Sequence, residues 1–247
     1  MVSVGGLGSL LIIAGPLASV YCATVMSSSF TILYSIACMF FWLAVLFGMA
    51  SVLVWFEPSP SLLTDEHTAL FHSEGSPLMH NIRILVVSMI FQEIGRYGSW
   101  LVHGAVVDVL GKRQGSPLVA KDILLLAITQ GLSHAIVHAM VFSGSWIPLL
   151  MGGGTLYNQT CPQMSVFTVG AVSMLAISSI ITLSTLHSHA AMAKYGAWSK
   201  RMSASGVHCL AACITLLNLI HGGCMVTVPL LCGVAVAYGT WVIRHKL

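Results

Sequence analysis

Hydrophobic residues in this chain fall into long runs that are separated by short polar breaks. The runs are apolar around the whole helical circumference, which is typical of helices in lipid and not of amphipathic helices on a soluble core. Each is near or above the ~20 residues that a helix needs to cross a bilayer core. The seven runs lie at about 2–26, 30–56, 79–109, 119–144, 163–187, 203–220 and 224–243. They predict an all-α, polytopic membrane protein in which residues 1–247 form a single bundle of seven transmembrane helices.

The composition agrees with this pattern and excludes several classes of protein. Of the 247 residues, 57% are hydrophobic and 7% are charged, whereas a soluble domain carries about a quarter charged residues. A disordered chain, a nucleic-acid-binding protein and a disulfide-rich secreted module are therefore excluded. The seven cysteines lie mostly within or beside the apolar runs, which predicts buried thiols and no disulfide framework. The first basic residue is Arg83, so the first run lacks the basic segment of a cleaved signal and is expected to remain as a helix.

Basic residues gather on one side of this predicted bundle. Eight of the 10 Lys and Arg residues fall in its third and fifth loops or at the C-terminus: Lys112, Arg113, Lys121, Lys194, Lys200, Arg201, Arg244 and Lys246. The second loop carries acidic residues instead: Glu57, Asp65, Glu66 and Glu74. Because positively charged loops remain in the cytosol, we expect a lumenal or extracellular N-terminus and a cytosolic C-terminus.

The third run contains a charged pair. Glu93 and Arg96 are three residues apart and so share a helix face, with Gln92 beside them. Charges at such a depth are costly, and they are usually functional or paired. We expect an internal ion pair that fixes the position of the helix. The alternative is a relay for protons or ions, or a catalytic carboxylate.

The fourth run combines a ridge of small residues with two histidines. Gly131, Ala135 and Ala139 follow one another at intervals of four, a spacing that lets another helix approach closely. His134 and His138 are also four apart, as metal ligands on a helix would be. The Glu of an HExxH motif is missing, because Ala135 follows His134. We therefore expect the two imidazoles to be structural, with hydrogen bonds to neighbouring helices or to a polar cavity, and we expect no metal.

Further polar residues lie in or after the later runs. His187 and His189 end the fifth run, where we expect them at the cytosolic interface. His208 and Asn218 lie in the sixth run and are expected to be structural. Asn158 begins an Asn-Gln-Thr glycosylation sequon in a loop that we expect on the lumenal side.

Residue types that are missing from the runs limit the chemistry. All of the lysines lie in loops or at the C-terminus, so none is available to bind retinal as a Schiff base. Asp108 and Asp122 lie at helix ends, which leaves Glu93 as the only deep carboxylate. An aspartyl protease needs two carboxylates that share a proton. The chain is therefore expected to have no catalytic residues and no cofactor.

Five short blocks, in order along nearly the whole chain, resemble one known family. The first block is Gly15-Pro16 in the first run. The others are FFWL followed by ASVLVWF at 40–56, FQEIGRY at 91–97, GLS at 131–133, and GVH followed by LN at 206–218. The family that these blocks resemble is the anterior-pharynx-defective (Aph) subunits of γ-secretase.

The resemblance implies a non-catalytic scaffold in the γ-secretase complex, an intramembrane aspartyl protease that cleaves type I membrane proteins, as in Notch signalling. The implied partners are a presenilin-type catalytic subunit, nicastrin with its lumenal ectodomain, and the presenilin-enhancer subunit, in membrane lipid and without nucleic acid. The implied locations are the endoplasmic reticulum, the Golgi, and the endosomal and plasma membranes.

The chain departs from this family at two places. The family has a ridge of three glycines where this chain has Gly131, Ala135 and Ala139. The family also has a histidine in the middle of its fifth span, paired across helices with the histidine that His208 matches. This chain has no histidine at 178–182, where that residue is expected, and its next histidines follow a turn or more later.

Two other functions remain open on the residues alone. One is an intramembrane metal-dependent protease that uses Glu93, His134 and His138. The other is a seven-helix transporter or receptor built around the same polar residues, although the sequence has no internal repeat of the kind that transporters show.

Overall fold

The chain folds into a bundle of helices. The computed structural model describes residues 4–56, 77–144, 146, 157–158, 161–193 and 198–246. Its α-helices are α1 (Val4–Thr24), α2 (Ser29–Phe56), α3 (Pro77–Gln114), α4 (Ala120–Gly144), α6 (Val166–Ala193), α7 (Trp198–Thr215) and α8 (Cys224–Lys246). Two 3-10 turns, η1 (Val25–Ser27) and η2 (Leu216–Leu219), follow α1 and α7, and a short hairpin of β1 (Tyr157–Asn158) and β2 (Cys161–Ser165) precedes α6. The predicted all-helical class is confirmed, and each predicted apolar run overlaps one of these seven helices.

The helices have the length and composition of a multi-pass membrane protein. Five apolar stretches among the described residues are long enough to cross a bilayer: Gly5–Ser27, Ser29–Val54, Ala120–Gly144, Val166–Ala190 and Cys224–Arg244. α3 is long enough, but Gln92, Glu93 and Arg96 in its middle lower its mean hydropathy. The apolar stretch of α7 and η2, Ser203–Leu219, is shorter than the other five. Seven spans therefore remain a prediction.

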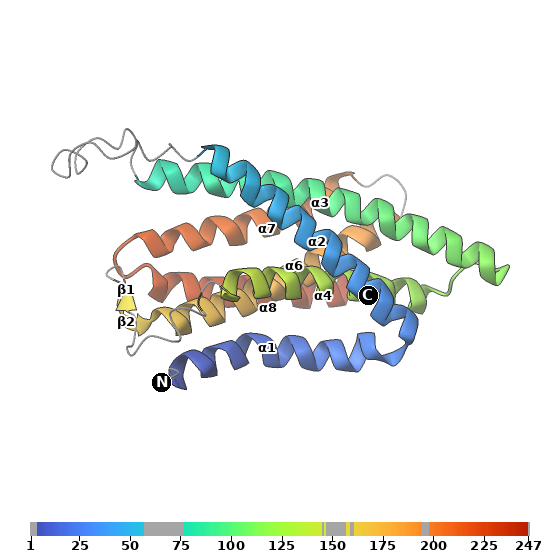
Figure 1. The fold of residues 1–247 in the computed structure, drawn as a ribbon, viewed down its shortest axis with the longest axis horizontal. Coiled ribbons are helices and arrows are strands. Elements are labelled where there is room, and N and C mark those ends of the chain that lie inside the picture. The colour runs from blue at the N-terminus through green and yellow to red at the C-terminus, as the bar shows by residue number, and fades with distance from the viewer. Residues whose placement is uncertain are drawn as a thin grey trace.

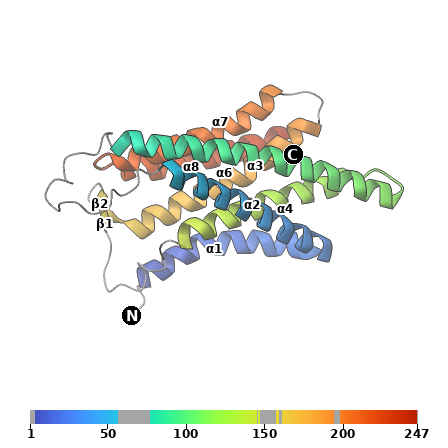
Figure 2. The ribbon, with the colours of Figure 1, turned by 45° about the horizontal axis from the view of Figure 1, so that its top comes forward.

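α4 and α6 form the centre of the bundle. α6 contacts α1, α4, α7 and α8, while α4 contacts α1, α2 and α3, and α2 also packs on α3. The helices run roughly along the long axis of the molecule (Figures 1 and 2). The N-terminus and the β-hairpin lie at one end, and the C-terminal part of α3 projects at the other (Figure 1).

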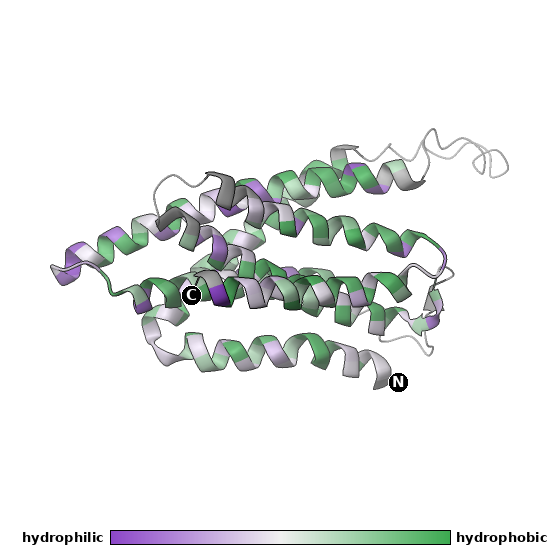
Figure 3. Ribbon diagram, turned by 180° about the vertical axis from the view of Figure 1, so that it is seen from behind, coloured by the Kyte–Doolittle hydropathy of each residue, from purple (hydrophilic) through white to green (hydrophobic). Residues whose placement is uncertain are grey.

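Polar side chains are buried in this bundle, and large apolar side chains face outward. Among the residues that the structure describes, nine polar ones have at most 1% exposure: Ser35, Thr129, Gln130, Ser133, His134, Ser178, Ser184, His187 and Thr227. Leu33, Phe40 and Val236, in contrast, are each more than 65% exposed. Hydrophobic colour covers most of the length of the helices in Figure 3. This distribution suits a lipid surround, because lipid solvates apolar side chains while buried polar groups bond to one another.

Two features at the helix ends differ from the predicted boundaries. α3 continues to Gln114, so Lys112 and Arg113 lie in its last turn, where a helix C-terminus favours positive charge. Lys121 lies in the first turn of α4, and Lys200 and Arg201 lie in α7, so these residues are helical and not in loops. The acidic second loop, residues 57–76, and Lys194 lie outside the described residues.

A tight turn connects η2 to α8. Gly222 has φ +73°, a backbone conformation that favours glycine. A Cβ at Gly223 would lie 1.7 Å from the carbonyl oxygen of Leu217, so this position leaves no room for a side chain. The glycine pair thus lets the chain reverse within a few residues and start α8.

One disulfide corrects the prediction that all the cysteines are buried thiols. Cys161 of β2 is bonded to Cys224, the first residue of α8, across a sequence separation of 63 residues. The two residues meet only because α6 and α8 pack side by side with their N-termini at the same end of the bundle. The five other cysteines are free, and Cys22, Cys209 and Cys213 are exposed on the outer surface.

Candidate functional site

A buried ionic cluster connects α3 to α7. Nη1 of Arg96 lies 3.1 Å from Oε1 of Glu93, and Ser205 of α7 donates a hydrogen bond of 2.5 Å to Oε2 of the same carboxylate. Nη2 of Arg96 donates to Nδ1 of His208, 2.7 Å away. Because a guanidinium can only donate, Nδ1 accepts, and the ring proton of neutral His208 lies on Nε2. The expected pair of Glu93 and Arg96 thus extends across two helices.

The burial of the two charges in this cluster is unequal. The side chain of Arg96 is 3% exposed, whereas that of Glu93 is 31% exposed. Gln92, the neighbour of Glu93, is also buried, and its Oε1 has no hydrogen-bond partner among the described residues. Asn218, the other polar residue predicted in the sixth run, lies half-buried in η2 and not in α7 itself.

His134 and His138 on α4 are packed chiefly against aromatic rings. The ring of His134 stacks on Trp42 of α2, with centroids 3.4 Å apart and planes nearly parallel. His138 packs on Phe142, with centroids 4.4 Å apart. Neither ring nitrogen of His134 has a hydrogen-bond partner among the described residues, and the same holds for Nδ1 of His138. The expected hydrogen bonds of His134 to neighbouring helices are therefore not found in that part of the chain.

The metal-protease alternative needs a third ligand beside these imidazoles. Zinc in a catalytic site takes three protein ligands. Among the described residues, no group of three or more His, Cys, Asp or Glu side chains is placed to hold a metal ion. Glu93, the carboxylate of that alternative, pairs with Arg96 and lies 3.6 Å from Nδ1 of His208.

A second buried network lies between α2, α3, α4 and α6. The hydroxyl of Tyr34 donates to Oε1 of Gln130, 3.3 Å away, and lies 3.3 Å from Nδ1 of His103. Because a phenol has one proton, Tyr34 accepts from His103 while it donates to Gln130. The ring of His103 in turn packs on His189 of α6, with centroids 4.2 Å apart. This network was missed from the sequence, although His103 and Gln130 are both polar residues inside apolar runs.

His187 and His189 are buried within the bundle, and their expected place at the cytosolic interface of the membrane stays a prediction. They are 0% and 8% exposed, because other helices pack around this part of α6. Nδ1 of His187 lies 2.8 Å from the hydroxyl of Tyr238 on α8, and its ring packs edge-on against Trp241. His187 is the first histidine after positions 178–182, where the histidine of the family is expected, and it contacts α8.

The small-residue ridge of α4 faces other helices of this chain. A Cβ on Gly131 would lie 3.0 Å from the carbonyl oxygen of Thr182 on α6, and the hydroxyl of Thr182 lies 3.5 Å from the Gly131 carbonyl. Ala135 is fully buried. Ala139 packs in a cluster with residues of α1 and α6. The ridge thus lets α4 and α6 approach closely within the subunit.

The glycosylation candidate lies at the end of the molecule that carries the disulfide. Asn158 is in β1, which pairs with β2, the strand that contains Cys161. The other two sequon residues, 159–160, lie outside the described residues.

Comparison with known proteins agrees with the resemblance in the sequence blocks. A family model described as Aph-1 protein matches residues 4–246, which is nearly the whole chain. A protein of Arabidopsis thaliana named gamma-secretase subunit APH1-like is 28% identical over 235 residues, covering 94% of this chain and 88% of that protein. The resemblance found in the sequence blocks is confirmed. The chain belongs to the Aph-1 protein family.

Proposed function

We propose that this chain is a non-catalytic scaffold subunit of a γ-secretase complex. Membership of the Aph-1 family and the name of the Arabidopsis relative support this role. The partners are a presenilin-type catalytic subunit, nicastrin and the presenilin-enhancer subunit. The complex cleaves type I membrane proteins, including those of Notch signalling, in the endoplasmic reticulum, Golgi, endosomal and plasma membranes.

The main observation in support of a non-catalytic role is that Glu93 pairs with Arg96. The described residues include three acidic side chains, and Asp108 and Asp122 are exposed near helix ends while Glu93 is in the middle of α3. An aspartyl protease needs two carboxylates that share a proton. Glu93 faces the cation of Arg96 and the hydroxyl of Ser205 instead. This arrangement supports a structural role for Glu93, with the catalytic aspartates supplied by the partner.

The proposed orientation has a lumenal or extracellular N-terminus and a cytosolic C-terminus. Lys112, Arg113 and Lys121 lie where α3 ends and α4 begins, and basic residues mark the cytosolic side. The Cys161–Cys224 disulfide lies at the opposite end, where α6 and α8 begin. Disulfides persist in oxidising compartments and are rare in the cytosol. Charge and redox chemistry therefore support the same orientation independently.

The buried polar clusters support the scaffold role through rigidity. In lipid, an unbonded polar group costs several kcal/mol, so helices joined by the Arg96–His208 and His187–Tyr238 contacts resist separation. The apolar outer faces then remain free to pack against the transmembrane helices of partners. His134 and His138 are part of the buried structure in this proposal.

Reconstitution tests the proposal. The purified chain in lipid vesicles is assayed for cleavage of a type I membrane substrate, first alone and then with presenilin, nicastrin and the presenilin enhancer. We expect no turnover alone and turnover with the partners. Cleavage by the isolated chain that a metal chelator abolishes would instead establish the metalloprotease. Ligand-dependent transport or signalling by the isolated chain would establish the transporter or receptor.

A matched pair of variants separates assembly from catalysis. His208→Ala removes the nitrogen that accepts from Nη2 of Arg96 and should lower both recovery of the complex and its activity in the same proportion. His221→Ala changes an exposed histidine in the turn before α8 and should alter neither. Loss of activity in His208→Ala with full recovery of the complex would contradict a purely structural role.

A further inference from the structure

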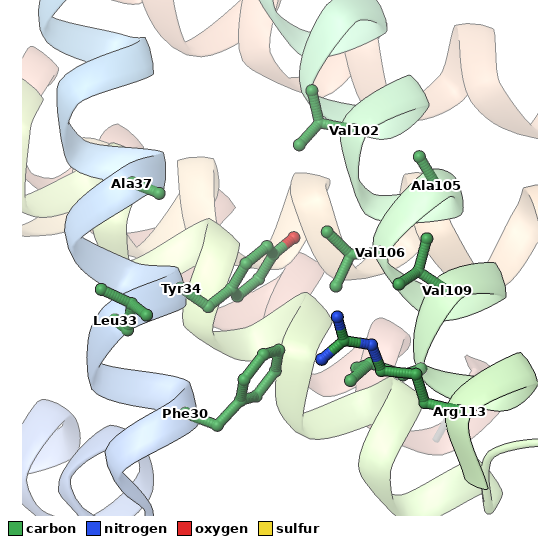
Figure 4. Close-up of a pocket in the computed structure, with 10 residues that line it drawn as sticks. Phe30, Leu33, Tyr34, Ala37, Val102, Ala105, Val106, Val109 and Arg113 are labelled. Carbon is green, nitrogen blue, oxygen red and sulfur yellow. The ribbon is translucent and has the colours of Figure 1, made fainter.

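An apolar groove runs between α2 and α3 on the outside of the bundle (Figure 4). Its volume is about 510 Å³. Side chains of both helices line it, among them Phe30, Leu33, Ala37, Val102, Val106 and Val109. Arg113 closes one end (Figure 4). We propose that this groove binds an acyl chain of an anionic glycerophospholipid from the cytosolic leaflet, with Arg113 holding the phosphate of the head group.

The length of the groove matches one leaflet. Val102 and Arg113 are the outermost lining residues on α3, eleven positions apart. At a rise of 1.5 Å per residue, they are separated by about 16 Å along the helix. Half of a ~30 Å hydrocarbon core is about 15 Å. An acyl chain that fills the groove therefore ends near the bilayer centre when its phosphate is at Arg113.

The charge at the end of the groove suits a phosphate. Lys112 is already paired with Asp108, 2.6 Å away, whereas the ion pairs within the described part of the chain do not include Arg113. The guanidinium of Arg113 extends back over the groove toward Phe30 and Tyr34 (Figure 4). Arginine binds phosphate through parallel hydrogen bonds, which fix the position of the head group as well as its charge.

The cytosolic leaflet is the source of the lipid because this leaflet carries the anionic lipids. The assignment rests on the orientation proposed above, in which the end of α3 with Arg113 is cytosolic. A transmembrane helix of a partner fits the same groove less well. Such a helix would bring apolar side chains against the Arg113 guanidinium, and an unpaired charge is costly to bury.

Native mass spectrometry of the full chain, with whatever subunits co-purify, tests the proposal. The delipidated sample in detergent is titrated with palmitoyl-oleoyl phosphatidylserine or with phosphatidylcholine that has the same acyl chains. We expect phosphatidylserine to be retained roughly fivefold better, the contribution of one basic residue near anionic lipid. Because the protein is in detergent, this preference is measured independently of the orientation and of protease activity.

Five variants locate the site. Arg113→Gln should abolish the preference for phosphatidylserine, and Arg113→Lys should keep most of it. Lys121→Gln removes the same charge at the same end but does not line the groove, and should have no effect. Ala105→Phe fills the groove and should reduce retention of both lipids, whereas Ala237→Phe on the outside of α8 should not.

Three results would overturn the assignment. An unchanged preference for phosphatidylserine in Arg113→Gln would show that Arg113 does not hold the head group. Unchanged retention of both lipids in Ala105→Phe would place lipid elsewhere. Loss of a co-purifying subunit in Ala105→Phe, with lipid retention unchanged, would show that a partner helix occupies the groove.

Discussion

Nη2 of Arg96 donates a hydrogen bond to Nδ1 of His208 across the interface of α3 and α7, over 2.7 Å. The same guanidinium pairs with Glu93 on its own helix, so one cation joins a local ion pair to a contact between helices. Within a bilayer no water replaces these partners. The position of α3 against α7 therefore depends on this cluster.

Loss of Arg96 should destabilise the chain more than loss of both charges. Arg96→Met leaves Glu93 uncompensated, and breaking a buried pair costs about 3–5 kcal/mol. We expect reduced recovery of the folded chain after heating in detergent, measured by size-exclusion chromatography, and partial recovery in the Glu93→Gln/Arg96→Met double variant. Asp108→Asn with Lys112→Met removes an exposed pair and should change stability by less than about 1 kcal/mol. If the double variant lost as much stability as the two single variants lose in sum, the pair would not be coupled.

The buried histidines should differ in their tolerance of phenylalanine. His134→Phe keeps a ring on Trp42 and removes two buried nitrogens that lack partners among the described residues, so stability should be unchanged or higher. His208→Phe removes the nitrogen that accepts from Nη2 of Arg96 and should cost about 1–3 kcal/mol. Thermal stability of the two purified variants, compared with the wild type, checks this difference. Equal losses would indicate that His134 has an essential polar partner.

A large side chain at Gly131 should separate α4 from α6. Gly131→Leu forces atoms against the backbone of Thr182, and overpacking of this kind costs about 1–3 kcal/mol or more. We expect lower recovery both of the folded chain and of the complex in affinity purification. Gly104→Leu is the control, because a Cβ at Gly104 meets no atom within 4 Å. Equal recovery of both variants would mean that the close approach of α4 and α6 is not required.

The disulfide should be visible as a difference in thiol count. The structure has five free cysteines of the seven in the sequence. Labelling of the denatured chain with a maleimide polymer should therefore add five labels before reduction and seven after. The Cys161→Ser/Cys224→Ser double variant should add five in both conditions. It should also be less stable, by up to roughly 4 kcal/mol in the chain-entropy view of a loop of this length. Seven labels without reductant would contradict the bond.

Tags at the two termini should report opposite sides of the membrane. In sealed microsomes, we expect protease to remove a C-terminal tag and to spare an N-terminal tag, because basic residues mark the cytosolic end. Detergent should expose both tags. If protease spared or removed both tags before detergent, an even number of spans would follow and the seven-span prediction would be wrong.

The sequence by itself determined the class of the fold and the local part of the site. Apolar runs of the right length predict helices in lipid because a backbone away from water must bond within its own segment. The runs overlapped the observed helices, with ends that differed where a helix continued into its polar flank, as at Lys112 and Arg113. Glu93 and Arg96 could be paired from their spacing, since helix geometry alone brings residues three apart onto one face.

Tertiary structure alone decided which distant residues meet. Tyr34 and Gln130 are 96 positions apart, and Cys161 and Cys224 are 63 apart, so their contacts depend on how α2, α4, α6 and α8 are rotated and paired. A helix that is apolar on every side gives no stripe from which that rotation can be read. For the same reason, the sequence did not show that His187 is buried against Tyr238. The polar contacts of neighbouring helices, and not the hydrophobic pattern of either helix, fix the rotation that buries it.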